Sequence, residues 1–167
     1  HGISQIINVP TDQPSIQAGI NAATDGDTVL VADSTYYENI NFNGHNVLVA
    51  SKYIFTLNDI DISNTIIDGS LGSISVVQIV SGETNAAGLV GLTIQGGNSN
   101  IDGGGIRIIN SSPRLDHLKI IYCNTTNVGG GIFLSNSGST ISNCVTRYNM
   151  ANRGGGMYFE GNGNNLI

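Results

Sequence analysis

Charged residues are scarce in this chain. Only 11% of its 167 residues are Asp, Glu, Lys or Arg, less than half the share of about 25% that is usual in soluble domains. Disordered chains combine low hydrophobicity with high charge, whereas 40% of this sequence is hydrophobic. Coiled coils need abundant Glu, Lys and Arg. Disorder and coiled coils are therefore both excluded.

Positive charge is the rarer sign, because six cations face twelve acids and leave a net charge of −6. The cations never form a run along the sequence: Lys52, Arg107, Arg114, Lys119, Arg147 and Arg153. Nucleic-acid binding depends on clustered cations that displace counterions. We therefore expect no nucleic-acid partner, and anionic membranes and acidic partners are disfavoured for the same reason.

Long hydrophobic runs and tryptophan are also missing. No apolar run approaches the roughly 20 residues of a transmembrane helix, so we expect no membrane insertion. The chain opens at His1 with no Met and no basic segment before it, which we interpret as a processed or trimmed start. Two cysteines are too few to indicate a redox compartment.

Glycine, in contrast, is abundant, with 23 residues. It recurs in three triplets that begin at Gly103, Gly129 and Gly154. A second apolar element precedes each triplet at the same spacing, and its copies begin at Leu89, Leu115 and Ile141. Two registered elements over three periods indicate a structural repeat of about 26 residues.

The segments that follow the triplets alternate in hydrophobicity. The first and third residues are apolar in 106–108, 132–134 and 157–159, and a period of two places these residues on one face of a strand. Each repeat is then a turn of chain with short strands and bends. Stacking of such turns at about 4.8 Å predicts an all-β parallel solenoid.

Asparagine recurs at fixed places in the repeat, in one column at Asn98, Asn124 and Asn149 and in another at Asn110 and Asn136, followed by Gly161. Asn tolerates left-handed backbone and can hydrogen-bond to its copy in the next turn. Stacked ladders and plain turn residues both explain the pattern. Either interpretation predicts bends at these positions.

Residues 1–50 differ from the rest of the chain. Residues 14–23 are the only stretch with helical periodicity, with Asp12 and Ser15 as candidate caps and Pro14 in the first turn. Strands are expected at 28–32, 39–42 and 47–50. We predict a single domain over 1–167, divided into an N-terminal cap and first turn (1–50), irregular turns (51–88) and regular repeats (89–167). The helix would cover the first turn's exposed end.

The opening of the chain resembles that of right-handed parallel β-helix proteins. The resemblance rests on Ser15–Ala23, Asp25–Ala32 and Tyr36–Ile40. That pectate-lyase-like superfamily includes pectate lyases and pectin methylesterases, and the Gly-Gly-Gly-Ile repeats resemble those of its secreted and surface members. The resemblance covers essentially the whole chain and implies a right-handed parallel β-helix with a short capping helix.

Enzymes of the superfamily that the chain resembles have catalytic motifs that can be compared with this sequence. Polysaccharide lyases of this fold bind Ca²⁺ with clustered acids and use a Lys or Arg as the base. Pectin methylesterases use an Arg-Pro-Trp segment, and polygalacturonases use paired Asp residues together with an Arg-Ile-Lys segment. None of these stands in the sequence. We therefore predict no catalytic residue, no cofactor and no metal site, although a fold of this kind does not fix an activity.

Two acidic segments have competing interpretations. Residues 58–64 faintly resemble a calcium loop, but Ile60 and Ile62 alternate as in a strand, so we expect a strand whose acids face water. Asp116 and His117 suggest an acid–base pair. Neighbouring strand residues point to opposite faces, however, and we expect a polar bend between inward-facing Leu115 and Leu118.

The two cysteines are expected to stay unpaired. Cys144 aligns with Leu118, whereas Cys123 lies five residues beyond it, about 16 Å along a strand. A disulfide needs Cα atoms within about 7 Å. We predict two free thiols, with Cys144 filling the core.

One column of outward side chains is a candidate ligand-binding surface: Gln78, Arg107, Phe133 and Tyr158. A flat face with stacked aromatic and polar groups can bind a sugar ring or a protein. The alternative is an ordinary structural ladder, which stabilises a sheet by about 0.2–1 kcal/mol per pair.

By the repeat spacing, Leu166 should begin a further strand. No polar cap or helix follows that strand, so the last circuit would present an unpaired strand edge. Such an edge implies either that the chain is a fragment of a longer solenoid or that it associates head to tail with another copy. We expect an extracellular or cell-surface β-helix that serves as a rigid or adhesive scaffold, or as a surface for a polysaccharide or cell-surface protein. The alternative is a fragment of a carbohydrate-active enzyme that lacks its catalytic turns.

Overall fold

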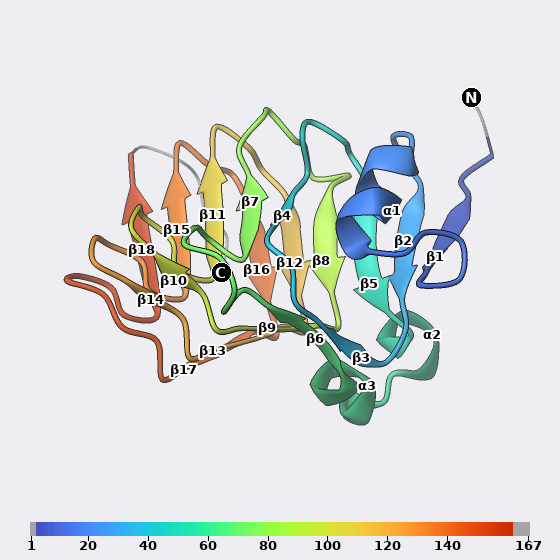
Figure 1. Ribbon diagram of the computed structural model, residues 1–167. Coiled ribbons are helices and arrows are strands. Elements are labelled where there is room, and N and C mark those ends of the chain that lie inside the picture. Colours follow the sequence, from blue (N-terminus) through green and yellow to red (C-terminus); the bar gives the residue numbers. More distant parts are fainter. Residues whose placement is uncertain (1–2, 162–167) are drawn as a thin grey trace.

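A computed structural model describes residues 3–161, and these form a mostly β structure in which all paired strands are parallel (Figure 1). Sheet A contains β1 (Ile6–Val9), β2 (Thr28–Val31), β5 (Leu48–Ser51), β8 (Gly88–Val90), β12 (Arg114–Asp116) and β16 (Thr140–Ser142). Sheet B contains β3 (Ser34–Tyr36), β6 (Thr65–Asp68), β9 (Thr93–Gln95), β13 (Lys119–Ile121) and β17 (Val145–Arg147). Sheet C contains β4 (Ile40–Asn41), β7 (Val77–Ile79), β11 (Ile106–Ile109), β15 (Ile132–Ser135) and β18 (Met157–Glu160). A small fourth sheet pairs β10 (Asn98–Ser99) with β14 (Asn124–Thr125).

From β2 onward the chain visits sheets A, B and C in rotation, and each such pass is called a circuit here. Strands of successive circuits lie side by side, so that Leu89 pairs with Leu115 and Leu115 with Ile141. In sheet C, Ile106 pairs with Ile132, which pairs with Met157. These pairings confirm the spacing that the repeat predicts.

The main core is a stack of mostly aliphatic side chains, and a smaller buried cluster of Ala50, Tyr53, Ile62 and Val90 lies beside the excursion of residues 52–64. In β11 and β15 the first and third residues belong to the main core, as the alternation predicts, and Ile94 and Ile120 extend it in sheet B. Full burial of such a side chain stabilises the fold by about 1.5–3 kcal/mol. Truncation of one of them, as in Ile120→Ala, is expected to cost about 2–5 kcal/mol.

The glycine triplets are required by backbone geometry. The first glycine of each has a positive φ, of 79° at Gly103, 72° at Gly129 and 60° at Gly154. The second approaches the next circuit closely, since a Cβ on Gly104 would lie 2.4 Å from the carbonyl oxygen of Gly130. Any larger residue would force the circuits apart.

The two asparagine columns behave differently. Asn110 and Asn136 both have positive φ, and Nδ2 of Asn136 donates to Oδ1 of Asn110 at 3.3 Å, which confirms a ladder there. In the other column Asn98 pairs with Asn124, but Asn124 pairs with Met150. The predicted place of Asn149 is therefore wrong by one residue, because its side chain instead bonds the backbone at Cys123 N and Ile120 O.

The predicted N-terminal helix is α1 (Ile16–Ala22), which packs against β1, β2 and β4 at one end of the stack (Figure 1). Ser15 is its N-cap, with Oγ accepting from Ala18 N at 3.1 Å. Asp12 does not cap the helix, and its carboxylate accepts from Asn8 instead. Glu38 adds a second cap by accepting from the amides of Ile16 and Gln17 at 2.9 and 3.0 Å.

Helix α1 is not the only helix, and the strand predicted over 58–64 is wrong. Residues 52–64 form an excursion with two short helices, α2 (Tyr53–Thr56) and α3 (Asp59–Asn64). Asn58 caps α3, accepting from Ile60 N at 3.1 Å, and acids in the first turn suit the helix dipole. Asp61 does not face water but is buried.

The predicted free thiols are confirmed. Cys123 is buried in the core, whereas Cys144 is only partly buried and packs against it. Within residues 3–161 no helix is long and apolar enough to cross a membrane. The strand predicted at Leu166 lies outside the described residues.

Candidate ligand-binding face

The predicted column on sheet C is present in the register. Gln78 pairs with Arg107, Arg107 with Phe133, and Phe133 with Tyr158. The rings of Phe133 and Tyr158 stack with centroids 6.3 Å apart and an interplanar angle of 11°. The four residues therefore form one ladder on the outer face of the sheet.

Phe133 in this ladder is covered, with an exposed fraction of only 2%. Glycine loops lie against the column, since a Cβ on Gly129 would come within 2.9 Å of Phe133 Cβ, and one on Gly154 within 2.9 Å of Tyr158 Cβ. The ring of Phe133 is therefore not accessible to a ligand, contrary to the prediction of an exposed aromatic face. Ligand binding at Gln78, Arg107 and Tyr158, which are partly exposed, stays a prediction.

A more accessible concave surface lies on the outer face of sheet B, at β13 and β17. It has a volume of about 360 Å³, within the range of about 300–1,000 Å³ of small-molecule pockets. We call it the tyrosine groove, and it is lined by Lys119, Ile121, Tyr122, Val145, Arg147 and Tyr148.

Two stacked tyrosines form one side of the groove. The rings of Tyr122 and Tyr148 lie 5.2 Å apart at 10°, and the residues are 57% and 71% exposed. Both residues have left-handed backbone, with φ of 54° and 55°. Bulky residues occupy this region at a cost of about 1–3 kcal/mol, and such strain is concentrated at functional sites.

Strand register places two cations on the same outer face. Lys119 pairs with Val145, and Ile121 with Arg147. Lys119 and Arg147 are therefore diagonal neighbours on adjacent strands, about 7–8 Å apart at Cα by analogy with other sheet pairs. An ammonium and a guanidinium group at this spacing can converge on one carboxylate, and Arg binds carboxylates in a bidentate manner.

A second, smaller hollow of about 130 Å³ adjoins the groove, because Lys119 and Val145 line both. We call it the α3 cleft. Its wall on the excursion side comes from α3, and its full lining is Asp59, Ile62, His117, Leu118, Lys119, Asn143 and Val145.

The bend predicted at Asp116 and His117 is confirmed, since His117 has a φ of 50° between inward Leu115 and Leu118. The two side chains nevertheless meet, with His117 Nδ1 2.8 Å from Asp116 Oδ1, although without the angles of a hydrogen bond. Partial burial opposes ionisation of Asp116, but hydrogen bonds from Asn143 and Ser142 outweigh it and lower its pKa.

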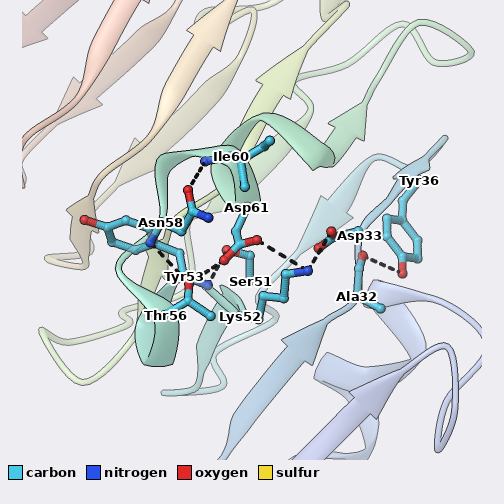
Figure 2. Close-up of polar contacts among 10 residues, drawn as sticks. All are labelled: Ala32, Asp33, Tyr36, Ser51, Lys52, Tyr53, Thr56, Asn58, Ile60 and Asp61. Carbon is cyan, nitrogen blue, oxygen red and sulfur yellow. Dashed lines mark hydrogen bonds and ion pairs between the residues drawn. The ribbon is translucent and has the colours of Figure 1, made fainter.

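Polar contacts within the excursion hold it together, and one of them joins it to the connection between β2 and β3 (Figure 2). Lys52 Nζ lies 2.8 Å from Asp33 Oδ2 and 3.4 Å from Asp61 Oδ1, and Thr56 Oγ1 donates to Asp61. Because Asp61 is buried and Lys52 is half-exposed, loss of Lys52 would leave a buried carboxylate with fewer partners. These contacts fix α3 as one wall of the cleft.

The sequence reasoning missed Tyr122 and Tyr148, although the signal was available: they are the same residue type at the same place in successive repeats. Within residues 3–161 no three His, Cys, Asp or Glu side chains gather as a metal site would require. No protein-family model, curated protein or solved structure matches this chain.

Proposed function

We propose that the chain is a right-handed parallel β-helix that acts as a rigid extracellular or cell-surface scaffold and binds an acidic saccharide in the tyrosine groove. The observation that carries this proposal is the pair of exposed tyrosines, both held at positive φ beside two cations. Sugar rings present apolar C–H faces and hydroxyls together, and tyrosine offers an apolar ring with a polar tip.

The parallel sheets with their repeating register support the solenoid fold. Such a stack is rigid because every circuit shares hydrogen bonds and core contacts with its neighbours. The negative net charge of −6 disfavours anions elsewhere on the surface. Lys119 and Arg147 line one hollow on the same face of adjacent strands, so we expect a carboxylate on the ligand to bind there.

The test is binding of the protein to immobilised glycans of three kinds, namely uronic-acid-bearing, sulfated and neutral. The variant Tyr122→Asn/Tyr148→Asn removes both rings, while Asn tolerates the left-handed backbone. Tyr37→Asn is the matched control, since Tyr37 is 60% exposed and does not line the groove. We expect uronic-acid glycans to bind, the double variant to lose at least tenfold in affinity, and the control to be unchanged. Equal binding by the double variant would contradict the proposal.

A second candidate is a carbohydrate-active enzyme, and one observation favours it: Asp59 and Lys119 line the same cleft beside the Asp116–His117 pair. A carboxylate, an imidazole and an amine are the groups used in acid–base catalysis. Release of unsaturated uronides from pectin or alginate would support this candidate. The absence of product over a day at high protein concentration would count against it.

A further inference from the structure

The excursion 52–64 replaces a much shorter connection. Thirteen residues separate β5 from β6, whereas two residues separate β8 from β9, β12 from β13, and β16 from β17. The added residues pack against later circuits of the chain. Figure 1 shows α2 and α3 together at the edge where sheet A passes into sheet B.

Three contacts hold the excursion over these circuits. Thr93 Oγ1 donates to the carbonyl of Ile62 at 2.7 Å, and Lys119 Nζ donates to Ser63 Oγ at 2.6 Å. The ring of Tyr53 packs on that of His117 with centroids 4.8 Å apart. The α3 cleft is therefore a built hollow between the excursion and the circuits of β12–β13 and β16–β17. Ser63 also fixes the ammonium of Lys119, which the cleft shares with the groove.

The cleft offers polar groups that its own residues leave unused. Within the described residues the Asp59 carboxylate accepts no hydrogen bond and forms no ion pair. Asn143 uses Nδ2 to reach Asp116 at 3.1 Å, which leaves its Oδ1 free to accept. His117 has Nδ1 against Asp116, which leaves Nε2 for a ligand. Acceptors and an imidazole spaced around a small hollow suit hydroxyl groups.

Charge divides this surface into two compartments. Asp59 lines the cleft and Asp116 lies beside it, against the single ammonium of Lys119, which the cleft shares with the groove. The groove is lined by the two cations Lys119 and Arg147 and by no acid, so a carboxylate is attracted there and disfavoured at the cleft end. An uncharged, hydroxyl-rich ring therefore fits the cleft, next to an acidic ring in the groove.

The direction of the combined surface follows from the strands. The cleft residues His117 and Asn143 precede β13 and β17, and Tyr122 and Tyr148 follow them. Residues 117 and 122 are five positions apart, about 16 Å at the rise of a strand. This is longer than one sugar ring, and it runs along the strands rather than from circuit to circuit.

We propose that the α3 cleft is a second sugar subsite, which takes a neutral ring joined to the acidic ring in the tyrosine groove, so that the ligand crosses sheet B along its strands. This inference rests on the proposed function of the groove. It makes the ligand at least a disaccharide with an acidic and a neutral unit.

The experiment is titration calorimetry with three probes: glucuronic acid, the neutral disaccharide xylobiose, and glucuronosyl-xylobiose, which joins them. We expect glucuronosyl-xylobiose to bind at least tenfold more tightly than glucuronic acid, a gain of about 1.4 kcal/mol. A control ligand used beside the three probes, trigalacturonate, in which the second ring is also charged, should gain less. Asp59→Asn and Asn143→Gly should each remove most of the gain and leave the affinity for glucuronic acid unchanged.

These variants avoid the problem of misfolding. Asn keeps the size of Asp59, and Gly accepts the left-handed backbone at Asn143, where φ is 53°. Asp102→Asn is the matched control, since Asp102 lines neither hollow. Equal affinity of the wild type for glucuronic acid and glucuronosyl-xylobiose would overturn the second subsite and leave the groove standing, as would a gain that survives in both variants. Binding of none of the three probes would overturn both.

Discussion

Glu83 and Ser111 are joined across one circuit of the chain, with Ser111 Oγ donating to Glu83 Oε2 at 2.7 Å. Glu83 is only 1% exposed, and its carboxylate also accepts from the amides of Gly44 at 2.9 Å and Ser81 at 2.8 Å. One buried acid thus binds three successive circuits. Buried charges persist in proteins only when hydrogen bonds compensate their desolvation.

Glu83→Ala is therefore expected to destabilise the protein strongly. Each buried donor left unpaired costs about 1–3 kcal/mol, and we expect a total loss of about 3 kcal/mol in the free energy of unfolding. Urea denaturation followed by circular dichroism measures it. Glu160→Ala, at an exposed acid, is the control and should change stability by less than about 0.5 kcal/mol. A similar loss in both variants would contradict the role of Glu83.

The α1 cap depends on Glu38. Its two carboxylate oxygens accept from the amides of Ile16 and Gln17, which have no partner within the helix. Glu38→Ala should lower stability by about 1–2 kcal/mol, in the range of other helix caps. Hydrogen exchange should show faster exchange at residues 16–22 with little change at β13 and β15. Uniform acceleration throughout the chain would mean that Glu38 acts beyond the cap.

Stability is expected to fall in acid, partly through Asp27. Hydrogen bonds from Gln5 N, Thr24 N and Thr24 Oγ1 lower the pKa of its carboxyl below the usual value. A carboxyl with a lowered pKa in the folded state stabilises the protein fully above its unfolded pKa of about 4. This stabilisation disappears as the pH falls through the lower, folded pKa.

The unfolding midpoint in urea should thus be level from pH 7 to about pH 5 and decline below about pH 4. Asp27→Asn should make this decline shallower, because the titrating group is gone. An identical acid slope in wild type and Asp27→Asn would refute the contribution of Asp27.

Both thiols should resist modification in the folded protein. Burial raises the pKa of Cys123 to about 12 and that of Cys144 to about 11, so the reactive thiolate is scarce at pH 8. Treatment with Ellman's reagent at pH 8 should label the urea-unfolded chain within minutes and the native chain far more slowly, with Cys144 ahead of Cys123. Rapid labelling of Cys123 in the native protein would contradict its place in the core.

We expect the two tyrosines of the groove to lower the free energy of unfolding, because both have left-handed backbone. Tyr122 and Tyr148 stand at corner positions where the preceding circuit has Gly96, with a φ of 70°. Asn is far easier to place in this backbone, and its advantage should offset the loss of ring stacking, which contributes about 0.5–1.5 kcal/mol. The variant Tyr122→Asn/Tyr148→Asn should therefore be at least as stable as the wild type in urea. A loss clearly larger than the stacking contribution would mean that the rings are structural.

Periodicity predicted much of the fold. The triplets at Gly103, Gly129 and Gly154 and the paired apolar elements predicted which strands lie side by side, because parallel circuits repeat the same backbone geometry. The excursion could not be predicted in this way. Its Asp and Ile residues alternate as in a strand, while the deciding feature, the side-chain cap from Asn58 to Ile60 N, is a local contact that competes with strand pairing.

The candidate site was harder to predict for a different reason. The column through Arg107 and Phe133 was placed correctly, but its accessibility depends on how the glycine loops fold back over Phe133, and no periodicity describes that. The tyrosine groove, conversely, follows from the repeat once Tyr122 and Tyr148 are aligned. The cleft beside it depends on the excursion and could not be predicted without it.

The most direct test of the central claim is amide chemical-shift mapping by NMR with glucuronosyl-xylobiose. It separates the outer face of sheet B from the ladder on sheet C in one titration. We predict that the largest shift changes fall at Lys119, Tyr122 and Arg147, and that those at Arg107 and Tyr158 stay small. Changes centred on Arg107 and Tyr158, with none at Tyr122, would contradict binding in the tyrosine groove.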